Sequence, residues 1–244
     1  MKIRFLAIGL VLILPLLALS QSAPQKPASP KPAPQQAKPV SPTSPPKQND
    51  DGENQTVKRE PRWIEPAERG GGRPYRELLN EGEHVSSRHF SEQELEPRFL
   101  STLLWEVSAT QREEGKPLDS RGVDIYLVTR DYVALYDREG QMLQIIEDGK
   151  DMRQSILGPE NLFAARAPLI LIYVANNKKL SQLPANKRDF YAAMDCGIAS
   201  RATYLFCASE HLVTITLDVD PVAVGKILGL KSDKVLLAQP VGFR

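Results

Sequence analysis

One long stretch, residues 187–212 (KRDFYAAMDCGIASRATYLFCASEHL), constrains the fold more than any other part of the chain. It contains no proline, Gly197 is its only internal helix breaker, and apolar residues recur on every side of the helix it would form. A helix that is apolar nearly all round belongs in the middle of a domain. Asp195, Arg201 and Glu210 interrupt the stretch too often for a membrane span. We therefore predict the central core helix of one soluble domain.

The N-terminus has the features of a secretory signal peptide. Lys2 and Arg4 precede an apolar run from Phe5 to Leu19, and small residues then place a cleavage signal after Ser20. This pattern predicts a periplasmic or secreted protein that is exported by the general route. An N-terminal segment that stays uncleaved and anchors the chain in the membrane is the alternative.

Residues 21–73 are dominated by proline, lysine, glutamine, serine and charged residues, and they end in a run of glycines. A segment of this composition cannot bury enough apolar surface to offset the entropy lost on ordering its backbone. We expect a disordered, proline-rich linker here. It separates the signal peptide, residues 1–20, from one folded domain over residues 74–244, which is long enough to bury a sizeable core.

The charges nearly cancel, with 31 Lys and Arg against 30 Asp and Glu. This balance argues against a broad attraction to nucleic acid or to an anionic membrane. The two cysteines, Cys196 and Cys207, lie three helical turns apart on the predicted helix, too far apart along its axis for a disulfide, so we interpret them as buried free thiols. The three histidines show no ligand spacing, and we predict no metal site.

Periodicity and turn signals predict the other elements of the domain. Ser91 and Glu94 form a capping box for a helix from about residue 92 to 107. The apolar run 167–176 is typical of a strand covered on both faces. The remaining predicted elements are an antiparallel three-stranded meander within 123–148, a short helix at 152–157, strands at 213–217 and 234–241, and a helix that Asp220-Pro221 starts and Gly229 ends. This order predicts an α+β architecture with helices packed on a mixed sheet.

Two parts of the domain resemble the nitroreductase family of flavoproteins, which includes SagB-type dehydrogenase-like domains. Residues 189–212 and 226–243 are similar to the family's central helix and to the helix and last strand that follow it, which ends here in Val-Gly-Phe. The front segment His84-Val85-Ser86-Ser87-Arg88-His89-Phe90 is similar to the family's Arg-x-Ser-x-Arg/Lys-x-Phe motif. The resemblance covers essentially all of the domain.

The resemblance implies a nitroreductase-like fold, with a mixed, mostly antiparallel sheet packed by helices around a long central helix. It also implies FMN bound at the interface of a homodimer, with His84, Ser86 and Arg88 as cofactor-binding residues and no catalytic residue assigned. A cation and a hydroxyl two residues apart can together meet a phosphate and a ribityl or ring oxygen. The implied function is that of an exported FMN-dependent oxidoreductase whose small-molecule donor and acceptor are unidentified.

Several positions depart from the family pattern. Arg201-Ala202 stands where the family has Gln-Asn, His211 stands where it has glycine, and Leu217-Asp218 stands where it has Arg-Gly. The family's flavin-contacting loop is replaced by a shorter one around residues 116–122. These differences motivate a second hypothesis, in which the domain is catalytically inactive, holds no flavin and acts as a dimeric binding or structural module.

Overall fold

The computed structural model describes residues 59–68, 70–74, 76–78, 80, 85–109 and 122–244, all within the compact unit Glu53–Arg244. The predicted signal peptide and most of the predicted linker lie outside these residues. The described helices and strands are β1 (Arg62–Trp63), α2 (Pro97–Ala109), β2 (Val123–Val128), β3 (Tyr132–Asp137), β4 (Met142–Asp148), α3 (Arg153–Leu157), the 3₁₀ helix η1 (Pro159–Arg166), β5 (Leu169–Ala175), α4 (Asn177–Leu180), α5 (Ala185–Ser209), β6 (Val213–Thr214), α6 (Pro221–Ile227) and β7 (Lys234–Gly242).

The strands form one sheet in the order β1-β4-β3-β2-β5-β7-β6. Each pairing between these named strands is antiparallel, and an isolated parallel bridge joins Ser86 to Thr214. The predicted meander is confirmed as β2, β3 and β4. The sheet is therefore mixed but mostly antiparallel, and the predicted α+β fold class is confirmed.

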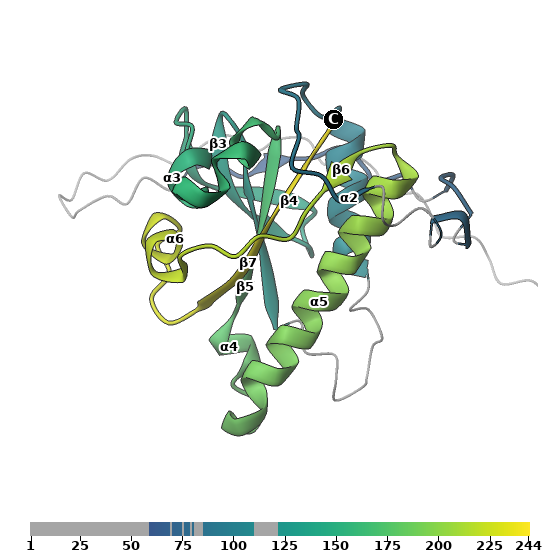
Figure 1. Ribbon diagram of the computed structural model, residues 1–244. Coiled ribbons are helices and arrows are strands. Elements are labelled where there is room, and N and C mark those ends of the chain that lie inside the picture. The colour runs from purple at the N-terminus through teal and green to yellow at the C-terminus, as the bar shows by residue number, and fades with distance from the viewer. Residues whose placement is uncertain (1–58, 69, 75, 79, 81–84, 110–121) are drawn as a thin grey trace, which may run out of the picture. The chain divides into compact units, whose positions relative to one another are not determined.

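Strand β5 lies in the middle of the sheet and is buried along its whole length. Leu169, Leu171 and Tyr173 belong to the core on one face, whereas the alternate residues Ile170 and Ile172 belong to the core on the other. Figure 1 shows α2 and α5 against one face of the sheet and α3 and α6 against the opposite face. The uninterrupted apolar run in the sequence thus marked a strand covered on both sides, as predicted.

Helix α5 is the long central helix, but it is buried on one side only. Its buried residues include Ala199, Thr203 and Cys207, whereas Phe190 and Ile198 are 67% and 41% exposed. The helix ends at Ser209, three residues before the predicted end, because His211 adopts a left-handed backbone conformation with φ 58°. No helix in the described ranges combines the length and the apolarity that a membrane crossing requires.

A buried polar network fastens α5 to the sheet. The hydroxyl of Tyr173 on β5 lies 2.8 Å from Thr203 Oγ1 on α5 and donates to Gln239 Oε1 on β7 at 3.1 Å. Gln239 Nε2 in turn donates to the carbonyl of Ser200 at 3.4 Å. Burial raises the pKa of Tyr173 far above its usual value, so the phenol stays protonated. Because polar groups in a core are stable only when they are paired, this network fixes how α5 sits on the sheet.

Helix α2 begins at Pro97, and the prediction that it starts near residue 92 is wrong. Proline is well tolerated in the first turn of a helix, since its fixed φ suits that turn and no hydrogen bond is lost there. The residue before a proline is biased away from helical conformations, so Glu96 favours an irregular segment upstream. The predicted capping box does not form, and the Ser91 hydroxyl is buried without a hydrogen-bond partner among the described residues.

The ends of two other predicted elements also differ. Strand β6 has two residues rather than the five predicted for 213–217, although Leu217 forms an isolated bridge with Ala238. Helix α6 begins as predicted, with the Asp220 carboxylate accepting hydrogen bonds from the backbone of Val222 and Ala223. On the N-terminal side, Arg62 and Trp63 pair with β4, so the sheet extends into the segment expected to be linker.

Both cysteines are free and buried, as predicted. Burial, and secondly the nearby charge of Asp195, raises the pKa of Cys196 to about 12. Burial alone raises the pKa of Cys207 far above its ordinary value. Both thiols are therefore protonated at neutral pH and act as small apolar groups of the core.

Replacing Tyr173 with phenylalanine tests the buried network. Tyr173→Phe leaves Thr203 and Gln239 short of a partner inside the core, so we expect a loss of about 1–3 kcal/mol in the free energy of unfolding. Equilibrium urea denaturation measures this loss. Tyr191→Phe, on the partly exposed side of α5, is the matched control. Equal effects of the two substitutions would contradict a stabilising role of the network.

Candidate functional site

The front segment from Val85 to Phe90 presents alternate side chains to opposite sides. Val85, Ser87 and Phe90 are buried, whereas Ser86 and Arg88 are exposed. The segment runs beside β6, where the Ser87 amide donates to the carbonyl of Thr214 at 3.2 Å. Ser86 forms an isolated bridge with Thr214 and Arg88 lies in the bend that follows, so the two exposed side chains are two residues apart along the chain. Two of the three predicted cofactor-binding residues are thus brought together, and the third, His84, lies outside the described residues.

Local contacts hold the Arg88 end of this segment. The Ser87 hydroxyl accepts from the His89 amide at 3.0 Å and closes a tight turn. The Arg88 guanidinium lies over the ring of Phe163 in η1, 5.4 Å from its centroid. A cation–π contact of this kind uses the face of the guanidinium and leaves its N–H edge free to bind a phosphate or a carbonyl oxygen. The contact with Phe163 therefore orients the Arg88 side chain and leaves its N–H donors available to a ligand.

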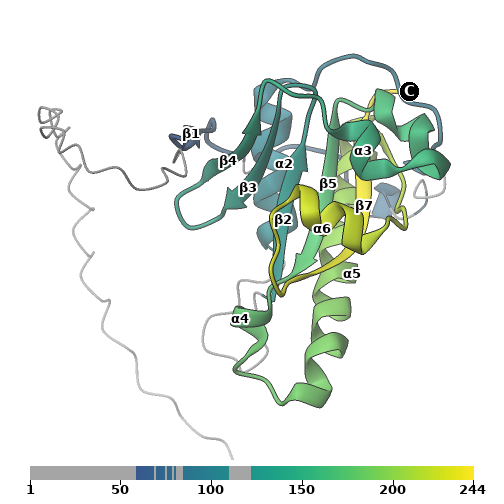
Figure 2. The same ribbon diagram turned by 90° about the vertical axis from the view of Figure 1, so that its left-hand side faces the viewer.

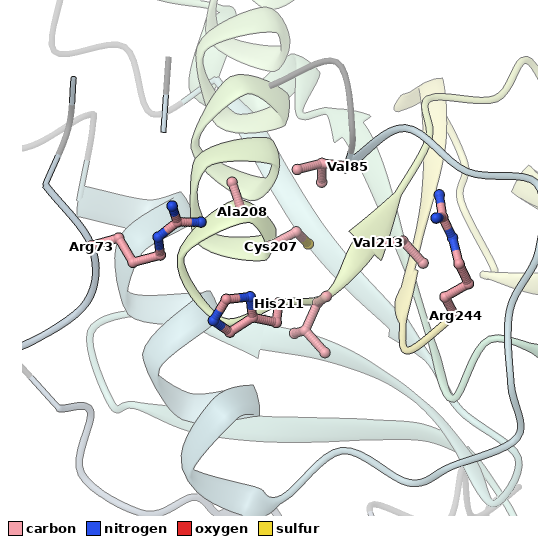
Figure 3. Close-up of a pocket in the computed structure, with 8 residues that line it drawn as sticks. Arg73, Val85, Cys207, Ala208, His211, Val213 and Arg244 are labelled. Atoms are coloured by element: carbon pink, nitrogen blue, oxygen red, sulfur yellow. The ribbon is translucent and has the colours of Figure 1, made fainter. Parts of the chain in front are cut away.

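A pocket of about 230 Å³ opens at the C-terminal end of α5, next to Val85 (Figure 3). Its walls come from the start of the described chain, the end of α5, β6 and the C-terminal segment. The lining residues are Arg73, Val85, Cys207, Ala208, His211, Leu212, Val213 and Arg244. Its charged side chains, Arg73 and Arg244, are both basic, and His211 adds an imidazole N–H, which suits an anionic group.

The helix end itself also explains part of this basic lining. The last carbonyls of a helix carry partial negative charge and favour nearby cations. Arg73 is tied to this region, because its amide donates to Ser209 Oγ at 3.2 Å and its guanidinium lies 3.7 Å from Glu77. The backbone of Arg73 is thus held at the end of α5, and the pocket beside it leaves room for a ligand.

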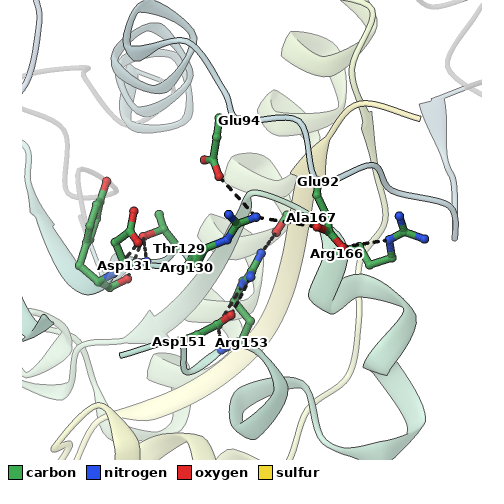
Figure 4. A network of polar contacts seen from close by, with 10 residues as sticks. Glu92, Glu94, Thr129, Arg130, Asp131, Asp151, Arg153, Arg166 and Ala167 are labelled. Atoms are coloured by element: carbon green, nitrogen blue, oxygen red, sulfur yellow. Dashed lines mark hydrogen bonds and ion pairs between the residues drawn. The ribbon is translucent and has the colours of Figure 1, made fainter. Parts of the chain in front are cut away.

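Ion pairs anchor the chain that follows the front segment (Figure 4). Arg130, in the turn after β2, lies 3.7 Å from Glu94 and 4.0 Å from Glu92, and Arg166 lies 3.6 Å from Glu92. Such exposed pairs contribute little individually, but together they restrict where the loop can lie.

Beneath these surface pairs, Arg153 is nearly buried. It pairs with Asp151 at 2.6 Å and donates to the carbonyl of Ala167 at 3.0 Å. This contact with the guanidinium lowers the pKa of Asp151, which therefore remains charged at neutral pH. The pair links α3 to the residue that follows η1, the element on which Arg88 rests.

The positions that depart from the family pattern are placed as follows. Arg201 is exposed and Ala202 is half-buried on α5, and Asp218 is exposed while its backbone carbonyl accepts from Asn161 Nδ2 at 2.8 Å. Of the loop 116–122, only Gly122 is among the described residues. Asp195 is 4% exposed and has an interaction partner. It is therefore a paired carboxylate of the core rather than a free acid.

Sequence reasoning missed the basic residues of the pocket. Arg73 lies in the segment predicted to be linker, and Arg244 follows the last strand. Neither forms a local motif with His211, from which they are separated by 138 and 33 residues along the chain. No signal in the sequence could have joined them, because only the folding of both ends of the domain around the end of α5 brings them together.

The donors fit the phosphate end of FMN. The phosphate requires cations and hydrogen-bond donors, which Ser86 and Arg88 offer on the front segment and Arg73 and Arg244 offer at the pocket that begins beside Val85. His84 would add a third residue of the front motif. The isoalloxazine ring requires N–H donors to its carbonyl oxygens, and the loop expected to supply them lies almost entirely outside the described residues. The described part of the chain therefore fits the phosphate end of the cofactor.

His211 offers a test of the local backbone. Left-handed backbone costs a residue with a β-carbon about 1 kcal/mol, a cost that glycine avoids. We expect His211→Gly to leave stability unchanged or raise it by up to about 1 kcal/mol, and His211→Val to lower it by about 1 kcal/mol or more. Thermal denaturation followed by circular dichroism measures both. Gln141, with φ 50° in the β3–β4 turn, provides the same pair of substitutions away from the pocket. Equal stability of His211→Gly and His211→Val would contradict this assignment.

Comparison with known proteins identifies the fold and the family. A structure assigned as a nitroreductase from Ralstonia eutropha JMP134 is 23% identical, with a TM-score of 0.63 over 77% of this chain and 90% of that one. A chain of the Escherichia coli microcin synthetase McbBCD complex is 17% identical, with a TM-score of 0.55 over 64% of this chain and 67% of that one. No curated protein matches. The profile of the nitroreductase family matches residues 83–243, and the chain therefore belongs to the nitroreductase family.

Proposed function

We propose that this protein is an exported, homodimeric oxidoreductase that uses FMN to transfer hydride or electrons to an unidentified acceptor. The observation that carries the proposal is the exposure of Ser86 and Arg88, two residues apart in the front segment, whose residue Val85 lines a pocket with basic walls. Membership of the nitroreductase family supports the oxidoreductase class. Export is supported by the signal-peptide features of residues 1–20.

In this proposal the residues of the chain bind and orient the cofactor. Arg88 donates its N–H edge to an FMN oxygen while Phe163 holds the face of its guanidinium. Ser86 donates its hydroxyl, and His84 takes the place of the family's first arginine with a shorter and only partly charged side chain. FMN, when bound, supplies hydride and electron transfer. Because soluble nicotinamide cofactors belong to the cytoplasm, an exported enzyme needs another small-molecule donor.

The homodimer is supported by two features of the single chain. The pocket of about 230 Å³ is smaller than the roughly 300–1,000 Å³ of sites that enclose a whole drug-sized ligand, so a second copy would have to complete a flavin site. The middle of α5 exposes Ile198 next to Gly197, whose backbone has no other part of the described chain within 4 Å of the position of a β-carbon. An apolar side chain beside such a notch suits a crossing with a second α5 helix.

Two observations favour the second hypothesis, a flavin-free binding module. Arg201 is exposed on α5 where the family has glutamine, and His211 occupies the left-handed position where the family has glycine. Both changes put bulky basic side chains on or near surfaces that the proposal assigns to the partner subunit or the cofactor. A purified protein that is colourless and takes up no added FMN would establish this alternative.

Arg88→Ala tests the cofactor site. Loss of a charge-assisted hydrogen bond is worth about 1.5–3 kcal/mol, so we expect FMN affinity to fall by about 10-fold to 100-fold. Quenching of flavin fluorescence during titration of the protein measures the affinity. Arg62→Ala, which removes an exposed arginine on β1 that is paired with Asp148 and lies over the ring of Tyr132, is the matched control and should bind FMN like the wild type. The site assignment is wrong if Arg88→Ala binds FMN as tightly as Arg62→Ala does.

Ile198→Glu tests the proposed dimer. Placing a carboxylate at the crossing point should shift the protein to monomer, because a charge would be buried against a second apolar helix. Sedimentation velocity reports the mass in solution. Val222→Glu on α6, where the valine is 64% exposed, is the matched control and should leave the dimer intact. Dimers that persist in Ile198→Glu, or a monomeric wild type, would refute this interface.

A further inference from the structure

Three segments of the chain meet at one end of the domain, which we term the basic tip: α4, the first turn of α5, and residues 231–234, which lead into β7 (Figures 1 and 2). The Asn177 amide donates to Asp233 Oδ1 at 2.8 Å, and Lys234 Nζ lies 3.6 Å from Asp189 Oδ1. These contacts join α4 and α5 to the turn before β7. The tip is therefore a defined part of the fold rather than three independent loops.

The basic tip has an excess of positive charge. Its cations are Lys178, Lys179, Lys187, Arg188, Lys231 and Lys234. The acids that face them are Asp124, Asp189 and Asp233, so six cations minus three acids leave an excess of three. Lys179 is paired with Asp124 at 2.6 Å, and Lys234 with Asp189.

Three of these lysines are exposed and form no ion pair with a described residue. Lys178, Lys187 and Lys231 are exposed, and none has an acidic partner among the described residues. Arg188 is used differently, because it donates to the carbonyls of Leu183 and Ser181 and braces the start of α5.

An aromatic side chain stands on the same tip. Phe190 is 67% exposed, three residues after Lys187 on α5, and its ring meets that of Tyr191 edge-on with centroids 5.5 Å apart. The start of α5 projects beyond the end of the sheet (Figure 1). A projecting surface of lysines around an exposed aromatic ring does not enclose a small molecule, but it suits a broad, anionic and partly apolar surface.

We propose that the basic tip docks the protein on the surface of an anionic phospholipid bilayer. Lys178, Lys187 and Lys231 contact lipid phosphates, and the ring of Phe190 enters the boundary between headgroups and acyl chains. The exposed ring favours a bilayer over a dissolved polyanion, which offers phosphates without an apolar layer. The inference is independent of flavin binding and goes beyond the proposed function.

The proposed dimer meets this surface at one residue. Phe190 lies seven residues, or two helical turns, before Gly197, so it is on the same face of α5 about 10 Å away along the axis. A crossing at Gly197 would therefore bring the partner helix near this ring. Lys178 and Lys231 come from α4 and from the turn before β7, outside that helix face.

Vesicle co-sedimentation tests the proposal with the compact unit Glu53–Arg244, which leaves out the apolar N-terminal segment that would bind any bilayer. We expect the fraction bound to phosphatidylglycerol-containing vesicles to exceed that bound to pure phosphatidylcholine vesicles by at least about tenfold, and to fall as salt rises from 0.1 to 0.5 M. The triple variant Lys178→Gln/Lys187→Gln/Lys231→Gln should lose at least about tenfold in binding. Phe190→Ser should also bind more weakly.

Matched controls separate the tip from general surface effects. Lys150→Gln removes an exposed lysine elsewhere, and Trp63→Ser removes an aromatic side chain that is 74% exposed on β1. Both should bind like the wild type, and circular dichroism checks that every variant is folded. Equal binding to both vesicle types, or full binding by the triple variant, would overturn the proposal. So would binding that Phe190→Ser leaves unchanged, which would assign the tip to a dissolved polyanion instead.

Discussion

The burial of β5 on both faces is the constraint on which the rest of this structure depends. A strand of seven apolar residues is stable only when each face is covered, and here α5 and α2 cover one face while α3, η1 and α6 cover the other. The Tyr173–Thr203–Gln239 network then sets the position of α5, since it joins that helix to both β5 and β7. Every other feature discussed above is placed relative to this fixed sandwich.

The candidate site follows from how that sandwich closes at the end of α5. The helix stops where His211 turns left-handed, β6 follows at once, and the front segment lies beside β6 through the amide of Ser87. As a result Ser86 and Arg88 are displayed along the sheet edge, and Arg73 and Arg244 approach from the two ends of the domain. The proposed phosphate site therefore draws on the front segment and on basic residues from both ends of the domain.

The net charge of the sequence and the local charge of the folded surface also differ. The near cancellation of 31 basic and 30 acidic residues argued against a broad attraction to an anionic partner, which is an argument about the average field of the chain. The same argument does not apply to each local surface, because salt at about 0.1 M screens charges that lie more than about 10 Å apart. What matters at the basic tip is its local excess, which arises because residues near 178, 187 and 231 are folded to one end of the domain.

The sequence by itself determined the elements whose signals are local. The apolar run of β5, the meander β2–β4, the proline and aspartate at the start of α6, and the long helix could be read directly, because side-chain periodicity and turn chemistry act over a few residues. The motif of Ser86 and Arg88 was also visible, since its two residues are close in the chain. Only the tertiary structure decided which side of α5 is buried and which basic residues surround its end. These depend on contacts between segments separated by tens to hundreds of residues, and no local pattern encodes such contacts.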